Sequence, residues 1–314
     1  WRAAPSCWPN WNRRRHERHR AGPKPLSPAV RSAEGHPVTI ADTLRALVTS
    51  GVPRLEAQQL LLLALGRDPQ ARAWLAAHDE LTLDDSARTR LAALARRHRD
   101  GEPMAYLRGE QGFHGLVLRS DPRALAPRPD TETLVDWALE LLAGLPPDAR
   151  AIDLGTGSGA IALALLHAAP GLRLTATDAS EAALSLAREN AQRLGLSLRF
   201  AAGAWLAAVP GERFELILSN PPYIAAGDPH LAALRHEPLS ALVSGADGLD
   251  DIRAIVAQAP GALTPGGWLL LEHGHDQAEA VQALLRAAGF EAVGGRTDLA
   301  GIVRCSGGRW PAAR

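Results

Sequence analysis

The hydrophobic and polar positions of the chain follow two different patterns. In the first, three stretches have helical periodicity and end at glycine, namely residues 40–51, 53–66 and 84–101. Proline or an acidic residue near the start and glycine after the end are typical helix boundaries. We therefore expect a small helical domain over residues 39–110.

In the second pattern, short apolar runs alternate with helical stretches. The apolar runs are predicted strands at residues 149–155, 172–178, 196–203, 214–220 and 266–274, and residues 290–307 can supply two more. Such alternation predicts a mostly parallel sheet with helices on both faces. We expect this α/β domain over residues 133–314, joined to the helical domain by a connector hairpin and a helix start at residues 111–132.

The charge of the chain is unevenly distributed, although its formal total is zero. Residues 1–36 carry eight basic and two acidic residues, so the remainder is net acidic. We interpret residues 1–38 as a basic, disordered tail, because a basic run without context is a weak signal for a nucleic-acid or ribosome-binding arm. The acidic remainder argues against direct nucleic-acid binding.

Cysteine content and hydropathy bear on the compartment. Cys7 and Cys305 are too few and too distant for a disulfide or zinc framework, so we expect a reducing, cytoplasmic location and no metal site. The longest charge-free run, residues 154–172, is interrupted by glycines and a proline. It is shorter as a helix than the ~20 residues that span a bilayer, so we expect no membrane segment.

A glycine-rich turn, DLGTGSGA, links a predicted strand to a helix. Its glycines allow close approach of a ligand, and the helix N-terminus offers unpaired N–H groups. Gly155, Gly157 and Ala160 fit the fingerprint of dinucleotide-binding folds. Asp153 with Gly155, Gly157 and Gly159 fits the turn of S-adenosylmethionine-dependent methyltransferases equally well. The turn alone leaves the cofactor class open.

Two acidic residues narrow the choice of cofactor. Asp178 ends the next predicted strand, where a carboxylate can accept two hydrogen bonds from a ribose diol in either class. Asp153 favours S-adenosylmethionine, because a charge on a buried strand needs a partner and the positively charged methionine part offers one. The alternative interpretation is that Asp153 caps the turn by binding backbone amides.

The predicted strand at residues 214–220 ends in Asn220, Pro221, Pro222 and Tyr223, and two prolines cannot continue it. Ligands of open α/β sheets bind where the strand order reverses, which would place Asn220 beside the glycine turn. The Asn220 oxygen and a rigid proline carbonyl can each accept an N–H of a planar amine and aim its nitrogen at a methyl donor, while Tyr223 stacks on it. The alternative is a Pro-Pro turn capped by Asn220.

These motifs, together with RRHRDGEPMAYLRGEQGFHGLVL, APRPDTETLVDWAL, EPLSALVSGADGL and GGWLLLEHG, resemble the PrmC/HemK family of protein-(glutamine-N5) methyltransferases. The likeness covers nearly all of residues 39–310. It implies a class I S-adenosylmethionine-dependent methyltransferase, with a Rossmann-like, mostly parallel seven-stranded sheet and a small N-terminal helical domain that docks the substrate. The implied substrate is the glutamine of the Gly-Gly-Gln loop of peptide chain release factors, whose methylation modulates translation termination.

The resemblance also implies roles for individual residues. The implied cofactor-binding residues are Gly155, Thr156, Gly157, Ser158, Gly159, Asp178, Trp205 and Asn220. The implied substrate-binding residues are Asn220, Pro221, Pro222 and Tyr223, of which Asn220, Pro221 and Tyr223 are catalytic. Trp205, which would otherwise be interpreted as core, flanks the adenine, and Ala204 replaces the polar or acidic residue usual in the family. Further candidates for the methionine end are Arg128, Asp130 and Glu132, with Asp130 equally suited as a helix N-cap.

Other functions remain open. An adenine-N6 methyltransferase acting on DNA or RNA can use the same Asn-Pro-Pro-Tyr turn after base flipping, although the acidic body argues against it. A ribosomal-protein glutamine methyltransferase is a near relative, but the N-terminal helices favour release factors. A non-catalytic cofactor-binding subunit and a nicotinamide-dependent dehydrogenase are weaker alternatives, because the motifs are intact and no hydride-transfer site follows the turn. We expect a monomer whose partner is a release factor.

Overall fold

The computed structural model describes residues 38–312 of the 314-residue chain. The predicted tail lies outside the described residues apart from Val38. Contacts within the chain divide it after Asp100 into two units, each of which is described by itself. The domain boundary at residue 110 stays a prediction. In the structure the short helix α6 (Met104–Arg108) lies after the division, and the Tyr106 hydroxyl donates to the Ala124 carbonyl at 2.7 Å.

The first unit contains four α-helices in the described residues: α2 (Ile40–Thr49), α3 (Arg54–Ala64), α4 (Arg72–Ala77) and α5 (Asp85–Arg99). The Thr39 hydroxyl and the Asp42 carboxylate form a capping box that starts α2. Helices α3 and α5 are joined by His98 Nε2 and Glu56 Oε2, 2.6 Å apart. The three predicted helices are confirmed, whereas α4 is too short for its periodicity to be recognised in the sequence.

A connector hairpin opens the second unit together with α6. Strands β1 (Glu110–Phe113) and β2 (Leu116–Arg119) pair antiparallel through a two-residue turn. His114 and Gly115 have φ of 46° and 78°, the left-handed values of a tight hairpin turn. Asn190 holds the hairpin, because its side chain accepts from the Arg119 N–H and donates to the Arg119 carbonyl. The predicted hairpin is thus present.

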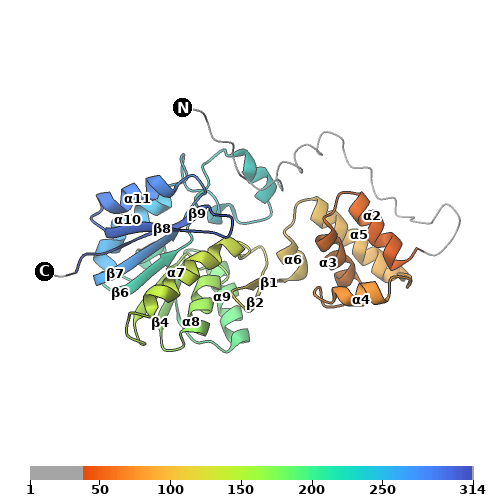
Figure 1. Cartoon of the computed structure of the whole chain (residues 1–314), viewed down its shortest axis with the longest axis horizontal. Coiled ribbons are helices and arrows are strands. Elements are labelled where there is room, and N and C mark those ends of the chain that lie inside the picture. Colours follow the sequence, from red (N-terminus) through yellow and green to blue (C-terminus); the bar gives the residue numbers. More distant parts are fainter. Residues whose placement is uncertain (1–37, 313–314) are drawn as a thin grey trace. The chain divides into compact units, whose positions relative to one another are not determined.

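The second unit is built on a seven-stranded sheet in the order β5-β4-β3-β6-β7-β9-β8 (Figure 1). Its strands are β3 (Arg150–Leu154), β4 (Arg173–Asp178), β5 (Arg199–Ala202), β6 (Phe214–Ser219), β7 (Leu263–Glu272), β8 (Glu291–Thr297) and β9 (Val303–Arg309). Every neighbouring pair is parallel except the two that involve β9. The expected mostly parallel sheet of the class I methyltransferases is confirmed.

Helices cover both faces of this sheet, as Figure 1 shows. One face packs against α7 (Glu132–Leu142), α8 (Ala160–Ala168) and α9 (Glu181–Leu194), and the other against α10 (Asp250–Ala262) and α11 (Ala278–Ala287). Within β6, Leu216 and Leu218 join the α7 and α8 core while Ile217 joins the α10 core. Successive strand residues are therefore buried on opposite faces, which explains the continuous apolar runs.

The strand order reverses between β3 and β6. The chain runs from β3 outward through β4 to β5 and then returns to the other side of β3 as β6. Leu154 pairs with Ser219, and the Ser219 hydroxyl donates to the Leu154 carbonyl at 2.7 Å. The next residues, Gly155 and Asn220, consequently leave the sheet side by side.

Residues 38–312 contain no helix that is both long and apolar enough to cross a bilayer.

Truncation of Leu218 tests the importance of the central strand. Its side chain is fully buried in the α7 and α8 core, so Leu218→Ala should lower the free energy of unfolding by about 2–5 kcal/mol. Urea denaturation measures the loss. Leu239→Ala is the matched control, because that side chain is 64% exposed and its loss should change stability by less than about 0.5 kcal/mol. Equal losses in the two variants would contradict the assigned core.

Candidate functional site

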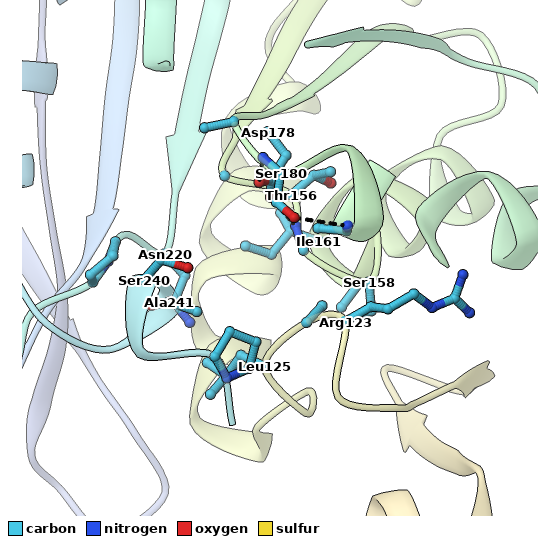
Figure 2. A pocket seen from close by; sticks show the side chains of 18 of the residues that line it. Arg123, Leu125, Thr156, Ser158, Ile161, Asp178, Ser180, Asn220, Ser240 and Ala241 are labelled. Atoms are coloured by element: carbon cyan, nitrogen blue, oxygen red, sulfur yellow. Dashed lines mark hydrogen bonds between the residues drawn. The ribbon is translucent and has the colours of Figure 1, made fainter. Parts of the chain in front are cut away.

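A cavity of about 320 Å³ lies at the carboxyl ends of β3, β4 and β6, where the strand order reverses. Figure 2 shows Asp178 and Ser180 on one wall, and Asn220 beside Ser240 and Ala241 on another. The lining comes from residues 123–128 and 131, 155–158 with 160 and 161, 178–180 with 183, 203–205, 220 and 222, 238 with 240 and 241, and 251. Open α/β sheets bind ligands at this point.

The glycine turn forms one wall of the cavity. Gly155 has a φ of 70°, and a Cβ there would lie 3.1 Å from Cζ3 of Trp205, so the backbone directly faces the tryptophan ring. Thr156, Gly157 and Ser158 also line the cavity. Gly159 does not; a Cβ there would lie 3.0 Å from Leu163 Cδ1, and the glycine instead allows α8 to start close to its neighbours. Four of the five predicted turn residues therefore reach the cavity.

Asp178 lies where the sequence predicted it, at the end of β4. Its Oδ2 accepts the Gly157 N–H at 2.9 Å, and its Oδ1 accepts the Ser180 N–H at 2.8 Å. Burial raises the pKa of this carboxyl, and the backbone N–H donors partly oppose the rise. Each carboxylate oxygen keeps further acceptor capacity, so Asp178 can also accept hydroxyl groups of a ligand.

Asp153 does not reach the cavity, which corrects the expectation that it meets a ligand's positive charge. Strand alternation directs it to the face of β3 that α8 covers, where its side chain is fully buried. The Thr156 hydroxyl donates to Asp153 Oδ2 at 2.6 Å, whereas Asp153 Oδ1 is buried without a hydrogen-bond partner among the described residues. Burial raises the pKa of Asp153 to about 7. Asp153 therefore anchors the turn through the Thr156 hydroxyl and not, as the alternative interpretation had it, through backbone amides.

Trp205 lies against the glycine turn and lines the cavity beside it. Its φ of 51° is left-handed, a strained conformation for a large side chain that is often found at ligand sites. It begins the 3₁₀ helix η3 (Trp205–Ala208), and the N–H of the next residue, Leu206, donates to Gln258 Oε1 at 3.2 Å. Ala204 lines the cavity without a polar side chain, which leaves backbone groups as the polar atoms on this part of the wall.

The Asn-Pro-Pro-Tyr segment contributes Asn220 and Pro222 to the cavity wall. Asn220 Nδ2 donates to Thr131 Oγ1 at 3.2 Å, so its Oδ1 is available as an acceptor (Figure 2). Pro221 is buried and Tyr223 half-buried, and neither lines this cavity. The Tyr223 carbonyl accepts from Gln277 Nε2 at 3.0 Å, and burial raises the pKa of its phenol above the usual range. The predicted contacts of Pro221 and Tyr223 with the substrate therefore stay predictions.

The further candidates from the PRPDTE segment separate in space. Arg128 lines the cavity and pairs with the buried carboxylate of Glu237, which also accepts the Ala126 N–H at 3.1 Å. Asp130 faces Arg304 at 3.5 Å, and no side-chain cap bond forms at the start of η2 (Pro129–Thr131) or α7. Asp130 therefore neither lines the cavity nor caps a helix.

Glu132 is also directed away from the cavity, because its Oε1 accepts the His114 N–H at 2.9 Å.

Two residues beside the site, Thr131 and Glu272, were not expected from the sequence. Thr131 lines the cavity, contacts Asn220 and is 4% exposed, and Glu272 ends β7 with 2% exposure. The apolar run before Glu272 was recognised as a strand. A charged residue directly after three buried leucines, Leu269–Leu271, is the signal that could have identified it. Glu237 carries no comparable signal, because it lies in a loop.

Family models and curated relatives both match this chain to methyltransferases. Residues 132–237 match the model of the methyltransferase small domain, and residues 40–109 match the PrmC N-terminal domain. Release factor glutamine methyltransferase of Bordetella pertussis is 51% identical over 83% of this chain and 97% of its own length. The protein of that name from Burkholderia pseudomallei is 48% identical over 88% of this chain and 97% of its own length.

A solved structure supports the fold alone. The catalytic domain of hMettl16, in complex with MAT2A 3'UTR hairpin 6, aligns with a TM-score of 0.50. It covers 71% of this chain and 92% of that one at 16% identity. Identity at this level indicates a shared architecture without indicating a shared substrate.

The buried carboxyl of Asp153 should make stability depend on pH. The pKa of Asp153 rises from a usual value of about 4 to about 7 on folding, so the folded chain holds the carboxyl proton more tightly than the unfolded chain. The stability that this proton contributes is therefore lost as the pH rises from about 4 to about 7. Asp153→Asn stays neutral and should gain stability relative to the unsubstituted protein between pH 4 and 7, by a few kcal/mol. Urea denaturation across pH measures the difference.

Asp148→Asn is the matched control for this experiment, because the Asp148 side chain is 63% exposed in the same unit. Its stability should follow that of the unsubstituted protein at every pH. If the Asp153→Asn curve also ran parallel to the unsubstituted one, the carboxyl would not titrate as the burial requires.

Proposed function

Since the chain belongs to the release factor glutamine methyltransferase family, we propose that it transfers a methyl group to the glutamine side-chain nitrogen (N5) in the Gly-Gly-Gln loop of a peptide chain release factor. The observation that carries the proposal is the Asn220 amide oxygen, which is available beside the glycine turn at the cavity. The proposal includes S-adenosylmethionine as methyl donor, an effect on translation termination, and a cytoplasmic monomer that does not bind nucleic acid directly.

The cavity residues fit S-adenosylmethionine. The Trp205 ring packs directly on the Gly155 backbone, which leaves no room for a side chain at position 155, and both residues line the cavity, where a flat adenine can lie along the ring. Asp178 can accept the ribose hydroxyls, and the N–H groups at the start of α8 add polar contacts. When bound, this cofactor supplies an activated methyl group on a sulfonium centre. The residues of this chain must place the acceptor nitrogen.

The acceptor nitrogen needs orientation more than deprotonation. The lone pair of an amide nitrogen is delocalised, so a general base adds little before the methyl group is transferred. Asn220 Oδ1 can accept one N–H of the substrate amide, and the carbonyls held by Pro221 and Pro222 are suited to accept the other. Orientation of this kind can lower a barrier by several kcal/mol. The surplus proton leaves after transfer, when the nitrogen is cationic and acidic.

Removal of the Asn220 side chain tests the proposal. Asn220→Ala should lower methyl transfer by roughly 100-fold or more, because the substrate nitrogen loses its orienting acceptor. Mass spectrometry of the release factor peptide measures transfer, and calorimetry with S-adenosylmethionine should show binding that changes far less. Methylation of adenine in nucleic acid by the unsubstituted protein, with the release factor unmodified, would overturn the proposal in favour of an adenine-N6 methyltransferase.

Gly155→Ala tests the cofactor site beside the glycine turn. The added Cβ would meet the Trp205 ring at 3.1 Å, so the affinity for S-adenosylmethionine should fall about tenfold or more. Gly195→Ala is the matched control, because Gly195 has a similar φ of 66° but open space around it. Both variants should lose stability, by about 1 kcal/mol, and only the first should lose affinity. Similar affinities in both variants would place the cofactor elsewhere.

A further inference from the structure

The side-chain amide of Asn220 is asymmetric, and only one of its two orientations is useful for the proposed function. With Oδ1 toward the cavity, Asn220 accepts an N–H of the substrate. The reversed amide would place its own N–H groups against the substrate N–H, and no hydrogen bond could form. In the structure, Asn220 Nδ2 donates to Thr131 Oγ1 at 3.2 Å. The contact with Thr131 therefore selects the useful orientation, provided that the Thr131 hydroxyl acts as the acceptor.

Glu272 determines the direction of the Thr131 hydroxyl. The Thr131 side chain lowers the pKa of the buried Glu272 carboxyl, as a hydroxyl that donates to the carboxylate does. An ionised carboxylate can only accept, so the single proton of the hydroxyl points at Glu272 and its lone pairs remain for Asn220. The hydrogen bonds thus run in one direction, from Asn220 through Thr131 to Glu272.

The fold brings these three distant residues together. Leu218 pairs with Leu270 across β6 and β7, and both side chains lie in the α7 and α8 core. Asn220 and Glu272 follow two residues later, so strand alternation directs both to that same face at neighbouring strand ends. Thr131 lies immediately before α7, on that face as well.

We propose that Thr131 and Glu272 are positioning residues that fix the Asn220 amide with its oxygen toward the substrate nitrogen. Neither is required to touch the reacting atoms, and Glu272 does not line the cavity. The inference rests on the proposed function, since it assumes an N–H donor as substrate. The inference also gives a role to a buried carboxyl that destabilises the fold, because Glu272 Oε2 is buried without a hydrogen-bond partner among the described residues.

The surroundings of Glu272 make this relay, the chain of hydrogen bonds from Asn220 through Thr131 to Glu272, sensitive to pH. The charged or titratable residues that face Glu272 are Asp130, Arg304, Arg128, Tyr223 and Cys305. Cys305 lies on β9, directly opposite Glu272 of β7. The adjacent His273 instead directs its ring to the Ser306 hydroxyl and the Gly274 carbonyl. Burial dominates and raises the pKa of Glu272 to about 7. Once protonated, Glu272 can donate to Thr131, whose own proton then points at Asn220 and favours the reversed amide.

Substitution of Thr131 tests the geometry. Thr131→Val removes the hydroxyl at nearly constant volume and should lower kcat for release factor methylation about tenfold or more, while the dissociation constant of S-adenosylmethionine changes less than about threefold. Thr131→Ser restores the hydroxyl and should recover most of kcat. Thr175→Val, a buried threonine on β4 outside the cavity, controls for the loss of a buried hydroxyl. A Thr131→Val variant with normal kcat would overturn the inference, as would a Thr131→Ser variant that is equally impaired.

Substitution of Glu272 tests the direction of the relay. In the unsubstituted protein, kcat should fall as the pH decreases through about 7, because protonated Glu272 no longer fixes the Thr131 hydroxyl. Glu272→Gln, with thermal unfolding verifying that it folds, should have a lower kcat and lack this acid limb, whereas Thr131→Ser should keep it. An unchanged acid limb in Glu272→Gln would overturn the inference. These outcomes are distinct from failure of the proposed function, in which the unsubstituted protein would not methylate the release factor at all.

Discussion

The pairing of β3 with β6 is the constraint on which the site depends. Leu154 and Ser219 are in register, and the hydroxyl of Ser219 binds the Leu154 carbonyl at 2.7 Å, so the two strands end at the same level. A shift by one residue would direct every side chain of β6 to the other face of the sheet. It would also separate Asn220 from the glycine turn. The register is specified strongly, because every residue of β6 except Glu215 is buried.

Two buried carboxyl groups that do not line the cavity lie behind its wall residues. Asp153 binds the Thr156 hydroxyl within the glycine turn, and Glu272 is the proposed acceptor for the Thr131 hydroxyl behind Asn220. Both are fully enclosed, and burial raises the pKa of each to about 7. In both places a buried acid fixes the direction of a threonine hydroxyl, which in turn orders a group at the cavity wall. Burial of a carboxyl is destabilising by itself, so such supports are expected near functional sites.

The sequence allowed much of this arrangement to be predicted. Periodicity and the glycine boundaries located the strands and the longer helices, and the fold class is confirmed. DLGTGSG, Asp178 and Asn220 were correctly expected to lie together, because ligand sites in open sheets follow from strand order. Helix α4 was missed because six residues carry too little periodicity. Asp153 was first assigned to the ligand because its motif does not reveal which face of β3 it occupies.

The parts that could not be predicted depend on contacts between distant segments. Thr131 and Asn220 are 89 residues apart in the sequence, and Glu272 comes later still. No local sequence pattern identifies Thr131 as a partner of Asn220. Similarly, a left-handed Trp205 against Gly155 follows from tertiary packing that overrides the local preference of a large side chain. Motifs therefore identify the groups that face a ligand, whereas the residues that orient those groups become visible only when strand register and helix placement are known. In this chain the orienting residues form the layer directly behind the motifs, on the face of the sheet that α7 and α8 cover.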